Sequence, residues 1–397
     1  MPCSLKCKAG DLDFTGPISY PPPVNLKRIS EQFEMHGSFV SAVPHGSGHI
    51  NDTYLVDTEQ GGRKVRYILQ RINRRVFHDP AAFMGNIQRV LSHLQKKMSD
   101  LPLPETARRV LSLVPSRTGE GYCQDEEEEV WRAYRHIEGA CSFDVAQSPH
   151  QVYEAARAFG TFQQMLMDLP PPPLLETLPH FHDTPHRMES LEKAIEKDAV
   201  NRASGADAEI EFCLSRVELS GSLSRLRALG ALAERTIHND TKLNNVLLDE
   251  KTGEGLCVID LDTVMPGLGV WDFGDLVRSA ANPAPEDEQD LRRVEVDMNL
   301  FESITRGWLE ALAGSLPASE RGALLTGAKV ITLECGVRFL TDYLEGDRYF
   351  RTHRPGQNLD RCRVQLALLR SLEQHEETLQ GIIRSCESGI SQGLRSS

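Results

Sequence analysis

The sequence lacks the features that mark membrane proteins and disulfide-stabilised secreted domains. Its nine cysteines are dispersed over 397 residues and include no CxxC pair, which is typical of reduced thiols rather than of a disulfide framework. No run of about eighteen apolar residues occurs, and the segment MPCSLKCKAGDLDF has no apolar stretch that could serve as a signal peptide. We therefore expect a cytoplasmic protein that does not span a membrane.

Positive charge is also in short supply. The chain has 44 Lys and Arg residues against 57 Asp and Glu residues, a formal net charge of -13, so we expect no general affinity for nucleic acid or for an anionic membrane. A local basic pocket could still hold a phosphate group. With 40% hydrophobic and 25% charged residues the composition is globular, and the length predicts two domains or one large two-lobed unit.

Strand-like and helical patterns divide the chain into two parts. In residues 25–138 the runs TYLVD, VRYILQRI, RRVLSLVPS and EEVWRAYRHIE predict strands, and one long helix is predicted to begin with Asp79 as N-cap and Pro80. In residues 139–385 helical spacing of apolar residues dominates. After the helix predicted for SPHQVYEAARAFGTFQQMLMDL, further helices are predicted at about 187–199, 207–229, 284–313, 318–345 and 358–384.

This layout predicts an α+β fold with two lobes, arranged as in protein kinases. A small antiparallel sheet with one long helix forms the first lobe, and the mostly helical second lobe carries a polar loop. Residues 1–24 are expected to be an irregular leader, and residues 386–397 a frayed tail.

The polar loop HNDTKLNNVLLD, residues 238–249, carries the strongest indication of chemistry. Phosphoryl transfer needs a carboxylate that orients the acceptor, oxygen ligands for Mg²⁺ and donors over the phosphates. In the pattern H-x-D-x-K-x-x-N, Asp240 would accept the proton of the attacking hydroxyl and Lys242 would reach the transferring phosphoryl group. Asn245 would offer an oxygen to Mg²⁺, and His238 would brace the loop. A polar cap before a buried strand is the alternative for an isolated HxD.

A second acidic motif, LCVIDLD, argues for the catalytic interpretation. Asp260 follows an apolar strand fifteen positions after Asn245, and Asp262 faces the same side if the strand continues. Two carboxylates and an amide oxygen suit a hard divalent ion, although Asp262 could instead be a turn residue. The letters DFG that begin at Asp272 follow a Pro-Gly turn, so we expect Asp272 to bond loop amides rather than a metal.

The segment PHGSGHINDTYLV is expected to cover the phosphates of a nucleotide. Gly46 and Gly48 would let backbone amides approach anionic oxygens, although a GxG turn is also a common hairpin. His49 and Asn51 would face the cleft.

The strand YILQRIN has no lysine where protein kinases carry their phosphate-binding lysine. It offers Gln70 or Arg71, and Arg71 is our candidate because a guanidinium pairs with phosphate. The following helix has no carboxylate between Asp79 and Met98, so the Lys–Glu pair of protein kinases is absent. Ile137 completes the candidates for nucleotide binding.

Polar side chains near the end of the helix in RFLTDYLEGDRYFRTHR are candidates for an acceptor pocket. Arg338, Asp342 and Tyr349 could line such a pocket, and a solvated surface helix is the alternative. The segment HFHDTPHR, residues 180–187, looks like a metal cluster, but its irregular spacing around a proline argues against zinc.

These stretches together resemble the N-acetylhexosamine 1-kinases of the aminoglycoside phosphotransferase and choline kinase superfamily. The resemblance rests on GSGHINDTYLV, YILQRIN, HFHDTPHR, HNDTKLNN, VIDLDTVMPG, DFGD and LECGVRFLTDYLEGDRYF. It implies ATP- and Mg²⁺-dependent phosphorylation of the anomeric hydroxyl of N-acetylglucosamine or N-acetylgalactosamine. The partners would then be ATP and a small sugar, and we expect a monomer.

The resemblance also implies roles for individual residues. Asp240 would be the catalytic base, and Asn245 and Asp260, with Asp262, would hold the metal. His49, Arg338 and Tyr349 would touch sugar or phosphate. Related chains phosphorylate choline, homoserine, methylthioribose or aminoglycosides, so another acceptor stays an alternative, as does a kinase-like protein without catalysis.

Overall fold

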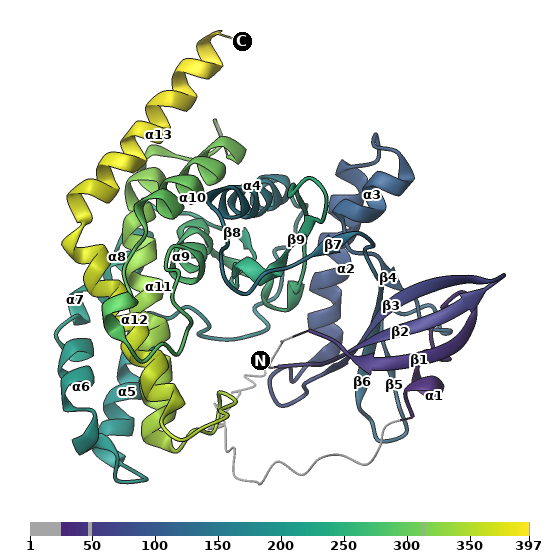
Figure 1. The fold of residues 1–397 in the computed structure, drawn as a ribbon, viewed down its shortest axis with the longest axis horizontal. Helices are drawn as coiled ribbons and strands as arrows, with labels where there is room; N and C mark the ends of the chain where they lie inside the picture. The colour runs from purple at the N-terminus through teal and green to yellow at the C-terminus, as the bar shows by residue number, and fades with distance from the viewer. Residues whose placement is uncertain (1–24, 47–49, 313, 397) are drawn as a thin grey trace, which may run out of the picture.

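The structure, a computed structural model, describes residues 25–46, 50–312 and 314–396, with side chains described up to residue 390. The predicted leader 1–24 and the candidates Gly48 and His49 therefore lie outside the described residues. Figure 1 shows a lobe built on a sheet beside a larger lobe built mainly of helices, which confirms the expected α+β fold.

A mainly antiparallel sheet forms the first lobe. Its strands lie in the order β1, β2, β3, β6, β4, and β5 also pairs with β6. Their bounds are β1 (Ser38–Pro44), β2 (Asp52–Gln60), β3 (Arg63–Ile72), β4 (Leu113–Val114), β5 (Cys123–Gln124) and β6 (Val130–Arg135). Both β2 and β3 were expected from their β-branched and aromatic residues and the turn at Gly61 and Gly62.

The two faces of this sheet pack against different parts of the molecule. Tyr67, Leu69 and Trp131 point to the outer face, where they form a core cluster with Phe33 near helix α1 (Leu26–Ser30). The neighbouring positions point to the opposite face, where Ile72 joins the large core shared with the helical lobe. Because side chains alternate along a strand, this arrangement fixes which polar residues face the space between the lobes.

The long helix of the sheet lobe confirms its sequence signals. Helix α2 (Pro80–Lys97) begins after Asp79, whose side chain accepts a hydrogen bond from the Ala82 amide. The strand predicted for RRVLSLVPS is wrong over its first part, where helix α3 (Leu103–Arg109) ends and only β4 is extended. Pro104 in the first turn and the Glu105–Arg109 pair favour this helix.

The second lobe is mostly helical, as expected, but several predicted helices have other bounds. Its helices are α4 (Pro149–Leu166), α5 (Thr184–Lys197), α6 (Asp207–Leu214), α7 (Val217–Ser220), α8 (Ser222–Ala228), α9 (Gly269–Ala280), α10 (Met298–Ala311), α11 (Ala318–Glu345), α12 (Gln357–Gln374) and α13 (Glu376–Ser396). Among the described residues, no helix combines the length and the apolar character needed to cross a bilayer.

The differences from the predicted helices have local causes. The helix predicted at 207–229 is three short helices, and Gly221 separates the last two. The helix predicted at 284–313 begins only at Met298, where the side chain of Asp297 accepts the amides of Asn299 and Leu300 and caps the first turn. The residues expected as a frayed tail continue α13, which extends away from the helical lobe in Figure 1.

Short strands in the helical lobe hold the polar loop. Strand β8 (Glu234–Ile237) pairs with β11 (Met265–Leu268), and β9 (Val246–Asp249) pairs with both β10 (Gly255–Val258) and β7 (Ala140–Cys141). The loop that starts at His238 therefore leaves one small sheet and enters another. Asp260 follows β10 directly, so it lies beside this loop.

Helices α9 and α11 approach each other through glycines. A Cβ atom built on Gly274 would lie 2.5 Å from the Gly327 carbonyl oxygen, and one built on Gly327 would lie 2.4 Å from the Val270 carbonyl oxygen. No side chain can be accommodated at these distances without moving the backbone of the neighbouring helix. Since α9 follows the loop region and carries Asp272, this contact sets the distance between the polar loop and α11.

We predict that Gly327→Ala lowers the free energy of unfolding by about 1–3 kcal/mol, because the new methyl group meets backbone atoms of α9. Gly322→Ala in the same helix is the control, since nothing lies within 4 Å of its Cβ position. It should raise the free energy of unfolding by about 0.5–1 kcal/mol through helix propensity. Urea denaturation measures both, and a stabilising Gly327→Ala would contradict the close packing.

Candidate active site

The carboxylate of Asp272 holds the backbone of the polar loop. Asp272, in the first turn of α9, accepts the backbone N–H of His238 at 3.0 Å and that of Asn239 at 2.7 Å. The Thr241 hydroxyl donates to the backbone carbonyl of Asp272. The prediction that Asp272 bonds loop amides is confirmed, and these bonds satisfy backbone groups that are buried away from water.

The backbone turns at Asn239, so that Asp240 is less buried than His238 and Asn239. It has a left-handed backbone with φ 66°, which asparagine tolerates better than most residues. Its side-chain amide donates to the Thr263 carbonyl at 2.9 Å, and the Thr263 hydroxyl donates to the His238 carbonyl at 2.6 Å. The loop and the segment after Asp260 are thereby tied to each other.

His238 braces the loop from inside the helical lobe. Its Nε2 lies 2.9 Å from the Ile259 carbonyl oxygen, and its Nδ1 lies 3.3 Å from the Asp240 backbone nitrogen. A carbonyl only accepts and an amide only donates, so Nε2 carries the proton and Nδ1 accepts. The rings of Phe159 and Phe162 lie edge-on to the imidazole, which keeps it in place.

Asp240, Lys242 and Asn245 meet around a single carboxylate. The ammonium of Lys242 lies 2.8 Å from Asp240 Oδ1, and the Asn245 amide donates to Asp240 Oδ2 at 3.1 Å and to the Asp240 carbonyl at 2.9 Å. Burial opposes ionisation of Asp240, but the charge and hydrogen bond of Lys242 hold its pKa below the usual value. The same contact raises the pKa of Lys242 despite burial, so both groups stay charged near neutral pH.

Asp260 has the electrostatic surroundings of a cation ligand. It has a left-handed backbone with φ 57° and an exposed side chain, so its carboxylate points away from the strand that precedes it. Although Asp260 reaches solvent, the surrounding protein partly desolvates its carboxylate, and this desolvation and the negative charges of Asp262 and Asp240 raise the pKa of Asp260 to about 7. A divalent cation would relieve this repulsion, and the Asn245 side-chain oxygen is left free because its amide nitrogen makes both bonds to Asp240.

The two oxygens of Asp262 are already engaged in the structure. Arg132 Nη2 of β6 lies 2.6 Å from Oδ1, and the side-chain amide of Asn51 donates to Oδ2. Both Arg132 and Asp262 are buried, with side-chain exposures of 1% and 6%. The pair therefore links the sheet lobe to the segment after Asp260, and the metal role of Asp262 stays a prediction, since each of its oxygens has a second lone pair beside these contacts.

The phosphate role predicted for Arg71 stays a prediction, and strand pairing places Arg71 on the face of the sheet away from the polar loop. Arg71 is paired across the sheet with Asp52 and Trp131, and its guanidinium binds the Asp52 carboxylate on the outer face. Gln70, one position earlier, faces the cleft and accepts a hydrogen bond from Arg132 Nε at 2.9 Å. Arg132 is thus the guanidinium that faces the polar loop. Sequence reasoning missed it because β6 is nearly uniformly buried and gives no alternating pattern.

Two of the nucleotide-binding candidates can be placed. Gly46 lies two residues after β1 with φ 80°, and no atom of the described residues other than its chain neighbours lies within 4 Å of its Cβ position. Ile137 is buried in the connection between β6 and β7, where the chain passes from one lobe to the other.

On the acceptor side, α11 and the loop after it bring Arg338 and Tyr349 together. The Arg338 guanidinium carbon lies 5.8 Å from the centre of the Tyr349 ring and 5.5 Å from that of Phe181. Arg187 is close by: its Nη2 donates to the backbone carbonyl of Phe181 at 3.2 Å, and burial and the charge of Arg338 lower its pKa. Its Nε is buried without a hydrogen-bond partner in the part of the chain that the structure describes. This corner is therefore positively charged and lined by aromatic rings.

Asp342, predicted as a substrate residue, instead organises the loop after α11. Its carboxylate accepts the backbone N–H groups of Arg348, Tyr349 and Phe350 at 2.7–2.9 Å and the side-chain amide of Asn358 at 2.8 Å. It is 3% exposed, so no acceptor molecule can reach it. The correction follows from a loop conformation that sequence patterns do not reveal.

The histidines of residues 180–187 do not form a metal site. His180 and His186 stack at the surface, whereas His182 is buried and lies 2.8 Å from a carboxylate oxygen of Glu334. Within the described ranges, no group of three or more His, Cys, Asp or Glu side chains is arranged to hold a metal ion. The structure gives His182 and Glu334 a position beside the polar loop that sequence reasoning did not foresee.

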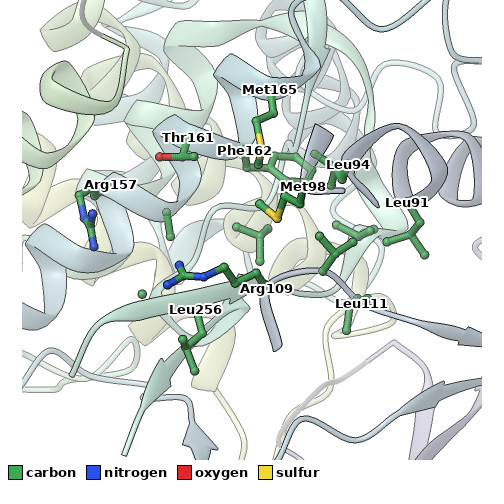
Figure 2. A pocket seen from close by; sticks show the side chains of 15 residues that line it. Leu91, Leu94, Met98, Arg109, Leu111, Arg157, Thr161, Phe162, Met165 and Leu256 are labelled. Atoms are coloured by element: carbon green, nitrogen blue, oxygen red, sulfur yellow. The ribbon is translucent and has the colours of Figure 1, made fainter. Parts of the chain in front are cut away.

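A cavity of about 120 Å³ lies next to this site but is not part of it. Figure 2 shows aliphatic side chains of α2, among them Leu91 and Leu94, with Phe162 of α4 and Leu256 of β10 around it. The charged side chains at its edge are paired, for example Arg109 with Glu254. None of the predicted catalytic, metal or acceptor residues lines it.

We predict that Arg132→Met lowers the free energy of unfolding by about 3–5 kcal/mol, because it leaves the buried Asp262 carboxylate without its counter-charge. Arg71→Met is the matched control, since its partner Asp52 is half exposed and such a pair contributes about 1 kcal/mol or less. Chemical denaturation of both variants measures the difference, and equal losses would contradict the special position of Arg132.

The chain can be compared with known proteins on this basis. Residues 41–312 match the phosphotransferase enzyme family, APH. Among solved structures, aminoglycoside phosphotransferase from Alicyclobacillus acidocaldarius is similar, with TM-score 0.57 and 14% identity over 94% of this chain and 98% of that chain. Choline kinase from Cryptosporidium parvum has TM-score 0.54 and 13% identity over 92% of this chain and 98% of that chain.

An AMP-bound spectinomycin phosphotransferase is also similar, with TM-score 0.51 and 13% identity over 92% of this chain and 98% of that chain. At these identities the likeness concerns the fold. The family match covers most of the chain, and it includes the polar loop, Asp260 and Asp272. This chain belongs to the phosphotransferase enzyme family.

Proposed function

We propose that the protein is an ATP- and Mg²⁺-dependent kinase of a small molecule, and that its acceptor is the anomeric hydroxyl of an N-acetylhexosamine. The observation that carries the proposal is the ionised carboxylate of Asp240, which Lys242 and Asn245 both contact and which lies beside the exposed Asp260. Phosphoryl transfer depends mainly on positioning and on compensation of charge, and this arrangement supplies both.

Asp240 is the residue that takes the proton. Its lowered pKa keeps it ionised near neutral pH, and the Asn245 amide and Lys242 ammonium orient its oxygens. An acceptor hydroxyl hydrogen-bonded to Asp240 would lose its proton to the carboxylate as its oxygen bonds to the γ-phosphorus, and ADP would leave. The anomeric hydroxyl of a sugar is more acidic than its other hydroxyls, which suits a carboxylate base.

Lys242 and the metal residues compensate charge on the phosphates. Lys242 stays protonated and is half-buried beside Asp240, from where it can reach the transferred group. Asn245 and Asp260 would hold Mg²⁺, which when bound neutralises charge on the phosphate oxygens. Asp262 would join them through the lone pairs that its contacts with Arg132 and Asn51 leave open.

The sheet lobe would bind the nucleotide. The turn at Gly46, with Gly48 beyond it, would cover the phosphates, and the buried Ile137 between the lobes would contact the base. The spectinomycin phosphotransferase with a similar fold binds AMP, which supports a nucleotide site in this arrangement of lobes.

The acceptor corner favours an uncharged or anionic molecule. The guanidinium groups of Arg187 and Arg338 offer donors to hydroxyl and acetamide oxygens, and the ring of Tyr349 offers a surface to the sugar. His49, which the resemblance places at the sugar, belongs to this proposal as well. Choline or an aminoglycoside, the second candidates, would bring positive charge next to two arginines.

The experiment that tests the proposal measures ATP consumption with a panel of acceptors, with and without Mg²⁺. The panel contains free hexoses, N-acetylglucosamine, N-acetylgalactosamine, choline and kanamycin. We expect turnover with the two N-acetylhexosamines that depends on Mg²⁺, and ³¹P and ¹H NMR should locate the phosphate on C1. Turnover with choline or kanamycin alone would replace the proposed acceptor, and ATP binding without turnover on any acceptor would support a kinase-like protein without catalysis.

We predict that Asp240→Asn lowers kcat by two to four orders of magnitude, or roughly 3–5 kcal/mol of barrier, because the amide cannot accept the proton. The thermal midpoint should change little, since Asp240 is half-buried and an amide can keep a contact with Asn245. Asp272→Ala is the comparison: it removes two acceptors of loop amides and should lower the midpoint strongly. Near-normal kcat in Asp240→Asn would exclude this residue as the base.

A further inference from the structure

Two buried side chains of opposite charge lie behind the polar loop and take no part in the chemistry proposed above. His182 precedes α5, Glu334 lies in the middle of α11, and their side chains are 5% and 2% exposed. His182 Nδ1 lies 2.8 Å from Glu334 Oε1, and His182 Nε2 lies 2.9 Å from the backbone carbonyl oxygen of Asn239.

The partners of the imidazole define where its protons are. A carbonyl oxygen can only accept, and the Glu334 carboxylate accepts a second hydrogen bond from the Thr184 hydroxyl at 2.7 Å. Both ring nitrogens of His182 therefore face acceptors, which an imidazolium satisfies and a neutral imidazole does not. A neutral ring would leave one of two buried acceptors without a donor.

The contact with Asn239 connects this pair to Asp240, the proposed base. Asn239 is held in a left-handed conformation and immediately precedes Asp240, so the position of its carbonyl fixes the direction in which Asp240 leaves the buried layer. Glu334 lies one helical turn before Arg338 on α11. A single pair of side chains thus connects the helix that carries the acceptor-side arginine with the residue before the proposed base.

We propose that His182 and Glu334 are positioning residues, which hold Asp240 in place through a doubly protonated imidazole that bridges α11 and the Asn239 carbonyl. The inference rests on the proposed role of Asp240 as the base. The pair then controls the rate of proton removal and not the binding of ATP.

The charges around the imidazole favour this protonation state. Burial opposes a charged ring, but Glu334, the Asn239 carbonyl and Asp275 of α9 raise the pKa of His182 above its usual value. For Glu334 burial works in the opposite direction, yet His182, Arg338 and the Thr184 hydroxyl hold its pKa below the usual value. Arg187 of α5 adds positive charge near Glu334, and the ring of Trp271 packs 5.3 Å from the imidazole.

The sign of the pH effect follows from the raised pKa of His182. Below that pKa the ring donates to both partners and the loop is held. As the pH rises through it, one ring proton is lost. The charged carboxylate of Glu334 is a stronger acceptor than a neutral carbonyl and keeps the Nδ1 proton, so the Asn239 carbonyl loses its donor. We expect kcat to fall on the alkaline side for this reason, whereas protonation of Asp240, with its lowered pKa, limits kcat only in acid.

Two substitutions of His182 separate its two contacts. The amide nitrogen of Gln occupies the place of Nε2, so His182→Gln keeps a donor for the Asn239 carbonyl. The amide nitrogen of Asn occupies the place of Nδ1, so His182→Asn keeps a donor for Glu334 and loses the loop. We expect kcat to fall about ten- to a hundredfold in His182→Asn and by less than about threefold in His182→Gln, with KM for ATP unchanged in both.

His186→Gln is the matched control, since His186 lies at the surface of the same segment, where its ring stacks on that of His180 and lies 3.9 Å from the Glu189 carboxylate. Its kcat should equal that of the unchanged protein. Equal losses in the Asn and Gln variants of His182, or a comparable loss in His186→Gln, would show a merely structural role and overturn the proposal. An alkaline decline of kcat that persists in His182→Gln would do the same.

A measurement without turnover covers the case in which a variant does not fold. In ¹⁵N NMR of the unchanged protein, both ring nitrogens of His182, assigned by the loss of their signals in His182→Gln, should remain protonated at a pH where surface histidines have already lost a proton. An unprotonated nitrogen in the His182 ring at pH 6.5 would overturn the proposal. If no acceptor in the panel is phosphorylated, the rate that is compared between variants is that of slow phosphoryl transfer from ATP to water. Failure of the proposed acceptor and failure of the positioning role therefore give different results.

Discussion

The arrangement of the site depends on how the backbone of one buried turn is satisfied. His238 and Asn239 expose amides and carbonyls in a layer where water is absent, and unpaired backbone groups there would cost more than the loop could recover. Asp272 accepts the two amides, Thr263 donates to one carbonyl, and His182 donates to the other. These bonds fix the backbone that precedes Asp240, and they thereby fix the direction of the Asp240 side chain toward the space between the lobes.

Three contacts made by buried charged side chains act at a distance from the proposed base. Asp272 holds the loop from α9, the His182–Glu334 pair connects it to α11, and Arg132 joins Asp262 to the sheet lobe. Each of these contacts joins different parts of the fold, so the relative position of the lobes and helices determines the conformation of the loop region. The glycine contact between α9 and α11 belongs to the same arrangement, because it sets the separation of the helices that carry Asp272 and Glu334.

The acceptor corner combines positive charge with aromatic surface. Arg187 and Arg338 lie close enough for the charge of one to affect the pKa of the other, and Phe181, Tyr349 and Phe350 surround Arg338. The loop that carries Tyr349 is held by Asp342, whose carboxylate is saturated by backbone and side-chain donors. The shape of this corner is thus set by a residue that no ligand can touch.

The sequence by itself determined the two-lobed α+β fold, the order of its main elements and the loop motif from His238 to Asn245. These features depend on local signals: strand alternation in β2 and β3, the Asp79 cap of α2, and a fixed spacing of polar residues. The bounds of the helices between residues 207 and 313 were less accessible, because the starts and ends of short helices depend on packing against neighbours.

Only the tertiary structure decided which side chains meet. Arg71 and Arg132 are both arginines on strands of the same sheet, and only the pairing of β3 with β6 shows that Arg132 faces the cleft. His182 and Glu334 are 152 positions apart, and Asp342 is saturated by a loop that closes back on it. A hydrogen bond between residues distant in the chain leaves no period or spacing in the sequence, because its geometry exists only once the helices have packed.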